Sequence, residues 1–570
     1  MRRTSMKAKK KLIPMVIGIL IAGLFAAFLL YRYAPTRETM SLKDYFTDAG
    51  DETCAVIFNG SYQAAEAGSR PNALIKDKMV YISLPYLKKN ADDCYVYDST
   101  EGVLRYATDR QLVTVLADSK TYTVDQENKT FDSKILIQEK GQVYLNLDWV
   151  KNYTDLTVRL EKSPNRLIIE QAGREKKTAK LRSSGKIRLR GGVKSKILAE
   201  AKKGDEVEVL EDYGGWSKVL SKNGVIGCIE NRKLGKVENT KVKKSLPERN
   251  YQHTSFGAKI NLVWHQVTSQ AANDRVASAL PSQSGINVIS PTWYSLSDNQ
   301  GNITDLSSAS YVQTCHQNQV KVWALVSNLG ENKVDSSQVL NTTSSRDRLI
   351  NNLMQTALKS GVDGINVDFE ALKSDAKDGY IEFIRELALK CRQNGLILSV
   401  DNYIPTTSSE FYQRKEQAAF ADYLIMMAYD EHYNGSKEAG SVASISWVKD
   451  GIKKTLNDVP ADQLVLGMPF YTRVWVQDEN GKLTSSAMGM QDAWNYMQNN
   501  QAEIKWSEKD GQNYGSFQKD GKTYECWLED EKSLELKLQA MQENQLAGGA
   551  FWKLGMEKSS VWELIRQYIK

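Results

Sequence analysis

The C-terminal part of the chain alternates between short apolar runs and stretches with helical spacing. This alternation constrains the fold more than any other feature of the sequence. The eight strand candidates are Ile260–His265, Ile286–Ser290, Val320–Ser327, Gly364–Glu370, Leu396–Asn402, Tyr423–Asp430, Leu464–Tyr471 and Gly549–Lys553. The helical segments include Arg346–Ser360, Gly379–Gln393, Glu410–Phe420, Ile445–Leu456 and Ser560–Ile569. Eight strands that alternate with helices predict an α/β fold, a (β/α)8 TIM barrel, over residues 256–570.

The fourth run ends in Asp-Gly-Ile-Asn-Val-Asp-Phe-Glu, which closes at Glu370. Side chains alternate along a strand with a period of two, so Asn366, Asp368 and Glu370 share one face. We expect the apolar residues between them to face the helices and the polar set to face the barrel mouth. Active sites of such barrels lie at the carboxyl ends of the strands. Two carboxylates and an amide in a barrel are costly unless they do chemistry or are paired. The pattern therefore predicts either a catalytic centre or a structural ion-pair network.

Three more motifs fall at strand ends in the right order: Met427-Ala-Tyr-Asp430, Gly467-Met-Pro-Phe-Tyr-Thr-Arg473 and Gly548-Gly-Ala-Phe-Trp552. Together the four motifs resemble glycoside hydrolase family 18 over the whole barrel. The segment YDEHYNGSKEAGSVASISWV after the sixth strand resembles the branch with spore-cortex and cell-wall N-acetylglucosaminidases. The family pattern on the fourth strand is Asp-Gly-x-Asp-x-Asp-x-Glu, and Asn366 replaces its middle aspartate.

The resemblance implies substrate-assisted retaining catalysis, which departs from the scheme with two catalytic carboxylates. Glu370 is expected to protonate the leaving glycosidic oxygen and then to act as base towards water. Asp368 is expected to orient the 2-acetamido group of the substrate, whose carbonyl oxygen is the nucleophile. Tyr429 is expected to donate a hydrogen bond to that carbonyl. Because Asn366 cannot share a proton with Asp368, the proton relay is simpler than in the family pattern, and we expect activity to be retained.

Substrate-binding residues are also implied by the resemblance. Trp552 is expected to form the apolar floor under the sugar ring. The remaining contacts are expected from Asn366, Asp430, Tyr471, Arg473 and Trp293. Residues 476–545 form a long connection between the last two strands, which is expected to build either one wall of the cleft or a purely structural hairpin.

The N-terminus predicts a membrane anchor. Residues 12–31 are uncharged and apolar, and at 1.5 Å per residue they span about 30 Å, the thickness of a hydrocarbon core. The basic tip, residues 1–11, holds six basic side chains and no acidic one, which equals the whole net charge of +6. The positive-inside rule then puts the tip in the cytoplasm and the rest of the chain outside the cell. A cleaved signal peptide is the alternative, and Tyr31-Arg32-Tyr33 is a poor cleavage site for it.

Two β-rich modules are predicted between the anchor and the barrel. Residues 32–72 are assigned to a tether, with a short strand at Ala55–Phe58. Residues 73–171 contain the two similar segments KMVYISLPYLKKN and GQVYLNLDWVKNY, each a strand followed by a helix start. This echo resembles the copper amine oxidase N-terminal domain. It implies no copper here, because the segment contains no histidine.

Residues 174–240 show strand alternation around Gly204-Asp205 and Gly214-Gly215 turns, and they resemble a bacterial SH3-like module. From Arg174 to Lys244 there are 20 basic and 9 acidic residues. This balance suits anionic wall polymers, and a charged, solvated spacer is the alternative. Residues 241–255 are assigned to a linker.

No cofactor or metal is expected, since the four histidines are not spaced as metal ligands. Nucleic acid is not expected as a partner either, because the excess charge belongs to the N-terminal tip. Cys54 and Cys94 are expected either to form a disulfide or to remain free thiols. The oligomeric state is left open.

The sequence therefore predicts a single-pass membrane protein with an extracytoplasmic catalytic domain. It is expected to hydrolyse β-1,4 bonds at N-acetylglucosamine in peptidoglycan. The alternatives are a chitinase acting on chitin oligomers and a catalytically silent protein that binds wall glycans.

Overall fold

The computed structural model describes residues 4–62, 64–65, 69–281, 284–330 and 332–569. It divides into two compact units, which are described separately here. The first unit contains residues 1–95, 115–122 and 128–248. The second contains residues 96–114, 123–127 and 249–570. Most of the predicted basic tip can be followed only as backbone, and residues 1–3 lie outside the described part.

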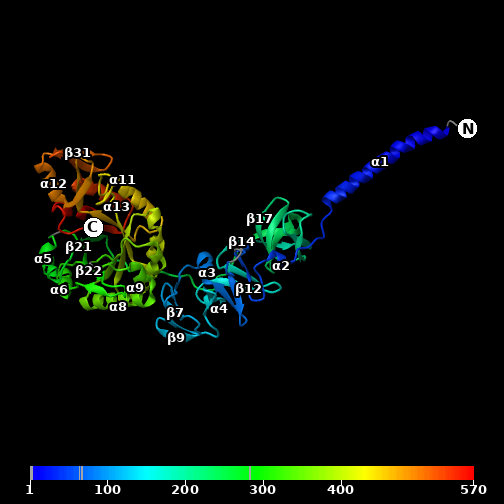
Figure 1. The fold of residues 1–570 in the computed structure, drawn as a ribbon, viewed down its shortest axis with the longest axis horizontal. Helices are drawn as coiled ribbons and strands as arrows, with labels where there is room; N and C mark the ends of the chain where they lie inside the picture. Colours follow the sequence, from blue (N-terminus) through cyan, green and yellow to red (C-terminus); the bar gives the residue numbers. More distant parts are fainter. Residues whose placement is uncertain (1–3, 63, 66–68, 282–283, 331, 570) are drawn as a thin grey trace. The chain divides into compact units, whose positions relative to one another are not determined.

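The second unit is built around a closed barrel of eight parallel strands, which confirms the predicted fold class (Figure 1). The barrel strands are β21 (Ile260–His265), β22 (Val288–Leu296), β24 (Lys321–Ser327), β25 (Gly364–Asp368), β26 (Ile397–Tyr403), β27 (Tyr423–Met427), β28 (Leu464–Pro469) and β34 (Gly548–Trp552). The order is β21-β34-β28-β27-β26-β25-β24-β22, and pairing between β21 and β22 closes the ring. Each strand overlaps one of the eight predicted runs. The short β23 (Ile303–Asp305) pairs antiparallel with β22 outside the ring.

Helices cover the outside of the barrel. They are α5 (Val276–Ala279), α6 (Ala309–Gln317), α7 (Ser336–Asn341), α8 (Thr343–Ser360), α9 (Lys377–Gln393), α10 (Arg414–Phe420), α11 (Ile445–Thr455), α13 (Glu531–Glu543) and α14 (Val561–Tyr568). The predicted helix Glu410–Phe420 is divided, because Gln413 has a φ of 53°. A 3-10 turn, η4 (Thr407–Tyr412), precedes that residue and α10 follows it.

The barrel strands separate two apolar layers. Ile365, Val367 and Phe369 of the fourth strand are buried in the layer shared with the helices, as the period of two predicts. A second cluster, which includes Leu262, Trp264 and Val465, fills the inside of the barrel. The polar face of β25 therefore looks into the barrel, where a polar group needs a partner.

The connection after β28 forms a separate small domain rather than a hairpin. Its five-stranded sheet has the order β30-β29-β33-β32-β31, and α12 (Met490–Asn499) packs on it. The strands are β29 (Tyr471–Gln477), β30 (Leu483–Gly489), β31 (Glu503–Ser507), β32 (Gln512–Lys519) and β33 (Lys522–Leu528).

In the first unit the two similar segments fold alike. Strand β4 (Met79–Ser83) leads into α3 (Leu84–Asn90), and β11 (Gln142–Asn146) leads into α4 (Leu147–Val150). The two strands pair antiparallel, and the helices begin at equivalent caps, Ser83 and Asn146. Beside them lie β3 (Ala73–Lys76) and β10 (Leu136–Glu139). A further sheet, whose residues are divided between the two units, has the order β5-β6-β7-β8-β9 and comprises β5 (Tyr95–Asp98), β6 (Val103–Ala107), β7 (Leu112–Leu116), β8 (Thr121–Val124) and β9 (Glu127–Thr130).

The segment assigned to a tether is largely folded. After α2 (Leu42–Tyr45), Phe46 is fully buried. The predicted strand is present as β1 (Ala55–Phe58), and it pairs parallel with β13 (Arg166–Gln171). Strands β2 (Ser61–Tyr62) and β12 (Leu156–Glu161) complete this sheet. The tether assignment was wrong because a partner strand more than 100 residues away completes the fold of this polar segment.

Residues 174–240 form most of a seven-stranded sheet in the order β16-β15-β19-β18-β17-β14-β20. Its strands are β14 (Glu175–Leu181), β15 (Gly185–Arg188), β16 (Ile197–Ala201), β17 (Glu206–Asp212), β18 (Trp216–Ser221), β19 (Ile226–Glu230) and β20 (Leu234–Lys241). Their resemblance to SH3-like modules stays a prediction.

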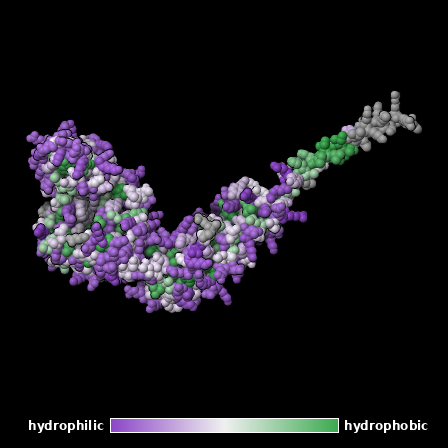
Figure 2. All heavy atoms as spheres, viewed as in Figure 1, coloured by the Kyte–Doolittle hydropathy of each residue, from purple (hydrophilic) through white to green (hydrophobic). Residues whose placement is uncertain are grey.

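One helix, α1 (Thr4–Tyr33), precedes these folded parts. Among the described residues it is the one helix long and apolar enough to cross a membrane, over Pro14–Tyr33. Figure 2 shows this apolar stretch in green, whereas the surfaces of the folded parts are mostly hydrophilic. All six cysteines are buried free thiols, including Cys54 and Cys94, so the open question of a disulfide is answered in favour of free thiols.

Candidate active site

The polar residues of the fourth strand lie at different depths. Asn366 is fully buried inside the barrel. Its Oδ1 accepts hydrogen bonds from Trp264 Nε1 at 3.0 Å and Ser290 Oγ at 2.9 Å. Its Nδ2 donates to Asp401 Oδ1 at 2.7 Å. The expectation that Asn366 contacts substrate is therefore wrong for this structure. Strand alternation predicts the face on which a side chain lies but not how deep in the barrel it lies. Asn366 lies below the site and forms hydrogen bonds to the polar groups there.

Asp368 lies one step nearer the barrel mouth. Its Oδ1 is buried and has no hydrogen-bond partner among the described residues. Burial, together with the nearby carboxyl of Glu370, raises the pKa of Asp368 to about 8. Burial also raises the pKa of Asp401 well above its usual range, with Asp368 as a second cause. Three carboxyl groups in one low-dielectric site cannot all be ionised near neutral pH, so at least one of them is protonated there.

Glu370 lies two residues after the end of β25, and its backbone is fixed by one residue. Its N–H donates to Asn328 Oδ1 at 2.7 Å, and its carbonyl oxygen accepts from Asn328 Nδ2 at 2.8 Å. The Tyr403 hydroxyl donates to the carboxyl oxygen Oε2 at 2.8 Å. Burial raises the pKa of Glu370, and the hydrogen bond from Tyr403 opposes this rise because it favours the ionised form. A carboxyl held in one position with a raised pKa can serve as a general acid.

Aromatic rings lie around the carboxyl pair. The Trp264 ring centroid is 5.9 Å from Trp552 and 6.4 Å from Tyr429, and Tyr429 lies 6.2 Å from Tyr471. Burial raises the pKa of Tyr429 well above its usual range, with Asp368 as a second cause, so its hydroxyl is a neutral donor. Tyr429 and Trp552 are only partly buried, which leaves each ring a surface that can contact a sugar.

Three of the predicted rim residues are close together. The Tyr471 hydroxyl donates to Asp430 Oδ1 at 2.6 Å, and Arg473 Nη2 lies 4.0 Å from the same oxygen. The Arg473 side chain is mostly buried, and its Nε has no partner among the described residues. These three groups form a polar cluster beside Tyr429.

Trp293 does not reach the site. It is 1% exposed, and its ring packs edge-on against Tyr311 in the layer shared with the helices. Its Nε1 donates to Asn273 Oδ1 at 2.8 Å. The pairing of β22 with β24 shifts register between Thr292 and Tyr294. This irregularity changes the alternation of β22, so the prediction of a rim contact was wrong.

Residues 264–557, just over half of the chain, match the model of the glycosyl hydrolases family 18. The chain belongs to glycosyl hydrolase family 18. Family 18 is a family of glycosyl hydrolases. Residues 62–169 match the copper amine oxidase N-terminal domain, which confirms the second predicted resemblance.

Relatives of this family 18 protein include spore enzymes. It is 28% identical over 223 residues to a Bacillus subtilis glycosylase that is named, provisionally, as sporulation-specific; the match covers 38% of this chain and 52% of the relative. It is 26% identical over 254 residues to the cortical fragment-lytic enzyme of Bacillus subtilis, and the match covers 42% of this chain and 58% of the relative. The chain thus spans little more than half the length of these relatives. The spore cortex-lytic enzyme SleL of Bacillus cereus shares the fold, with a TM-score of 0.50 and 19% identity over 58% of this chain and 77% of that one.

The family 18 site includes three residues that the sequence analysis missed. Asn328 follows β24, and Asp401 and Tyr403 lie at the end of β26. A signal existed for the last two, because Ser399 and Asp401 alternate with Leu398 and Val400, and Tyr403 stands two residues after Asp401 on the same face. Asn328 forms hydrogen bonds with the backbone of Glu370, 42 residues later, and no local sequence pattern indicates them.

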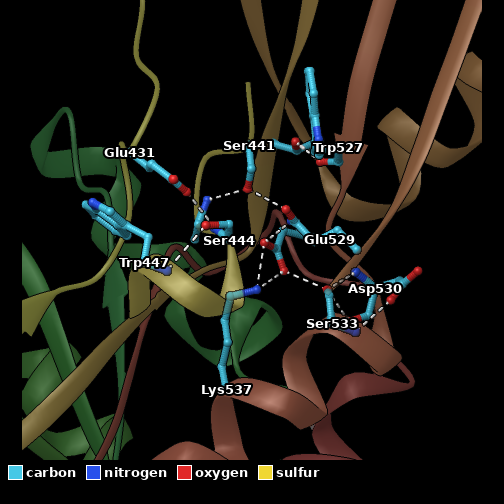
Figure 3. Close-up of polar contacts among 12 residues, drawn as sticks. Glu431, Ser441, Ser444, Trp447, Trp527, Glu529, Asp530, Ser533 and Lys537 are labelled. Atoms are coloured by element: carbon cyan, nitrogen blue, oxygen red, sulfur yellow. Dashed lines mark hydrogen bonds and ion pairs between the residues drawn. The ribbon is translucent and has the colours of Figure 1, made fainter. Parts of the chain in front are cut away.

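A buried network ties the loop after β27 to the small domain and to α13 (Figure 3). Lys537 Nζ donates to both oxygens of Glu529, at 2.9 and 3.0 Å, and both side chains are essentially unexposed. Gln512 bridges Glu529 to Ser441, which lies in the same loop after β27 as Asp430. Ser444 N donates to Glu431 Oε2 at 2.8 Å in the same loop. The network therefore fixes the loop that carries a rim residue.

Side chains suited to a cation are found elsewhere. In the described part of the chain, the one group close enough to share a metal ion is Asp92, Asp93 and Cys94, in the first unit. Asp92 already accepts hydrogen bonds from Cys94 N and Thr154 Oγ1.

Proposed function

We propose that this family 18 glycosidase hydrolyses β-1,4 bonds next to N-acetylglucosamine in peptidoglycan, by substrate-assisted retaining catalysis. Glu370 protonates the leaving oxygen. The acetamido carbonyl oxygen of the substrate attacks the anomeric carbon as the glycosidic bond breaks, which gives a cyclic intermediate. Water then attacks the anomeric carbon, Glu370 takes the proton from that water, and the bond to the acetamido oxygen breaks. Asp368 orients the acetamido N–H and stabilises the positive charge of the cyclic intermediate, while Tyr429 donates to the acetamido oxygen.

The observation that carries this proposal is the buried Oδ1 of Asp368, which has no protein partner in the described structure. A buried polar oxygen without a partner costs about 1–3 kcal/mol. The N–H of a bound acetamido group would satisfy it. A sugar without the N-acetyl group would supply neither this donor nor the nucleophile, so the mechanism requires an N-acetylated sugar at the cleaved position.

Two observations favour peptidoglycan over chitin as substrate. The relatives include an enzyme named for lysis of cortical fragments. The region from Arg174 to Lys244 is strongly basic, which suits the anionic bacterial wall. The apolar stretch Pro14–Tyr33 and the basic residues before it further support a single-pass protein with the barrel outside the cell.

The test is digestion of purified peptidoglycan, and separately of chitin oligomers, by the full chain in a neutral detergent. Products are analysed by mass spectrometry, with Glu370→Gln as the control. Muropeptides that end in a reducing N-acetylglucosamine, absent with the variant, are expected. Cleavage of chitin oligomers alone would refute the proposed substrate. Retained binding without any product would refute the enzymatic role and leave a glycan-binding protein.

The anchor is tested by cell fractionation with an antibody against the barrel. The proposal expects a chain of full mass in the membrane fraction, accessible to protease added outside the cell. A shorter chain in the medium, starting shortly after Tyr33, would show instead that the helix is a cleaved signal.

A further inference from the structure

A hollow of about 470 Å³ lies on the seven-stranded sheet of the first unit, over strands β15, β16, β18 and β19. None of its lining residues belongs to the catalytic barrel. Trp216, at the start of β18, lines it and is partly exposed. Gly185 lines it as well: a Cβ there would lie 3.1 Å from Ile229 Cδ1 and 3.3 Å from Lys233 Cγ. The absence of a side chain at this position keeps that part of the hollow open.

The lining is cationic. It contains five basic residues, and its two acidic residues are Glu200 and Glu230. Two of the basic groups are already engaged. Arg188 donates to the carbonyl oxygen of Ser195 at 2.6 Å, and Arg232 pairs with Glu230 at 2.5 Å.

The other three basic groups are the ammonium groups of Lys186, Lys202 and Lys233. Within the described residues, none of these three groups has an ion-pair or hydrogen-bond partner. Like charges gathered around one concave surface repel one another, and a bound anion relieves that repulsion. The hollow therefore has the charge of an anion site, with an aromatic ring at its edge.

Chain connectivity places this hollow near the end of α1. Pro35 is one of its lining residues, and α1 ends at Tyr33. Two residues of chain span at most about 8 Å, since successive Cα atoms are about 3.8 Å apart. If α1 crosses the membrane, as proposed above, the hollow lies at the outer membrane surface. Anions there are chiefly phosphodiesters, from lipid headgroups or from phosphate-linked wall polymers.

We propose that this hollow is a binding site for phosphodiester anions, with Lys186, Lys202 and Lys233 as the charged contacts and Trp216 as an apolar one. Lysine binds phosphate as a compact point charge without the planar geometry that a carboxylate-binding arginine fork supplies. Three free lysines around one hollow therefore suit the anionic oxygens of a phosphate group. The location at the membrane rests on the proposed function, whereas the binding itself does not.

The test measures binding of the full chain in neutral detergent micelles by isothermal titration calorimetry. Poly(glycerol phosphate) is the polymer probe, and micelles doped with phosphatidylglycerol or with phosphatidylcholine are the lipid probes. The variant is Lys186→Gln/Lys202→Gln/Lys233→Gln. The matched control, Lys177→Gln/Lys180→Gln/Lys236→Gln, removes the same charge from exposed positions of the same sheet. We expect the first variant to weaken binding of at least one phosphodiester probe tenfold or more, and the control to weaken it less than threefold.

The probe that is bound identifies the source of the phosphodiester. Equal losses in the two variants would refute a specific site, because net charge alone would then explain the binding. Equal affinity for poly-glutamate would refute the preference for phosphate, and no binding of any probe would refute the site. Hydrolysis of peptidoglycan freed of phosphate polymers is measured alongside. Its rate should be the same for all three proteins, so a failure of this inference is distinguishable from a failure of the proposed function.

Discussion

Replacement of Tyr403 by Phe should move the alkaline limit of activity to higher pH. The Tyr403 hydroxyl donates to Glu370 Oε2 at 2.8 Å, which stabilises the ionised carboxylate and opposes the rise in pKa caused by burial. A hydrogen bond to a charged group contributes about 1.5–3 kcal/mol. One pKa unit corresponds to about 1.36 kcal/mol, so loss of the bond should raise the apparent pKa of Glu370 by roughly one to two units.

The sign of the effect follows from the role proposed for Glu370 as the general acid. A general acid must be protonated in the free enzyme, so kcat/KM falls as pH rises through its pKa. A higher pKa moves that descending limb to higher pH. Because Asp368 interacts with Glu370, the limb reports an apparent pKa of the pair. The assay is kcat/KM for a soluble N-acetylated oligosaccharide from pH 4 to 10, with an unactivated leaving group.

Tyr412→Phe is the matched control. Tyr412 lies 6.1 Å from Tyr403 between ring centroids, and its hydroxyl donates to the Phe369 carbonyl oxygen rather than to the Glu370 carboxyl. It should lower activity without moving the limb. An unmoved limb in Tyr403→Phe, or one displaced to lower pH, would refute the reasoning that this hydroxyl sets the pKa of the acid.

Three other predictions follow from the same structure. Asp368→Asn should abolish hydrolysis and should also raise the melting temperature at pH 8–9, because a pKa raised from 3.8 to about 8 corresponds to at most about 6 kcal/mol of stability lost by the wild type. The raised pKa of Asp368 stabilises the protonated folded state below about pH 4, and this contribution is lost as pH rises through about 8. Thermal scans should therefore show a gap between variant and wild type that closes near pH 4, and a gap independent of pH would contradict the assignment. Lys537→Met should lower the free energy of unfolding in urea by about 3–5 kcal/mol, because Glu529 is then buried without its ion-pair partner. The double variant Glu529→Leu/Lys537→Met should recover most of this loss. No recovery would argue against the ion pair. Lys454→Met, at an exposed pair with Asp450, is its control and should cost less than about 1 kcal/mol. Trp552→Ala should lower kcat/KM at least tenfold, about 1.4 kcal/mol, mainly through KM; an unchanged KM would exclude Trp552 as the sugar platform.

Local patterns in the sequence were sufficient for the architecture of the barrel. Each of the eight apolar runs became a barrel strand, because a strand buried on both faces has a recognisable length and composition. The period of two along the fourth strand correctly separated Ile365, Val367 and Phe369 from the polar set. The echo in the first unit predicted two strand–helix pairs, and both are present.

Local patterns failed where a partner distant in the sequence decides the outcome. The segment around Phe46 and β1 looks like a polar tether until β13 pairs with it. Trp293 is an aromatic residue near the end of a predicted strand, as a rim residue would be. A register shift in β22 places it instead in the layer shared with the helices. The connection after β28 could be assigned to a hairpin or a cleft wall, and its five-stranded sheet became visible only in the folded structure.

The sequence by itself determined which residue types stand at the ends of the barrel strands, because periodicity is a property of neighbours along one chain segment. It could not determine how deeply Asn366 is buried in the barrel. It could not determine either the hydrogen bonds of Asn328 to the Glu370 backbone or the hydrogen bond from the Tyr403 hydroxyl to the Glu370 carboxyl. These contacts join β25 to the strands on either side of it, β24 and β26, and across the barrel to β21 and β22. They depend on the register and closure of the barrel, which only the tertiary structure decides.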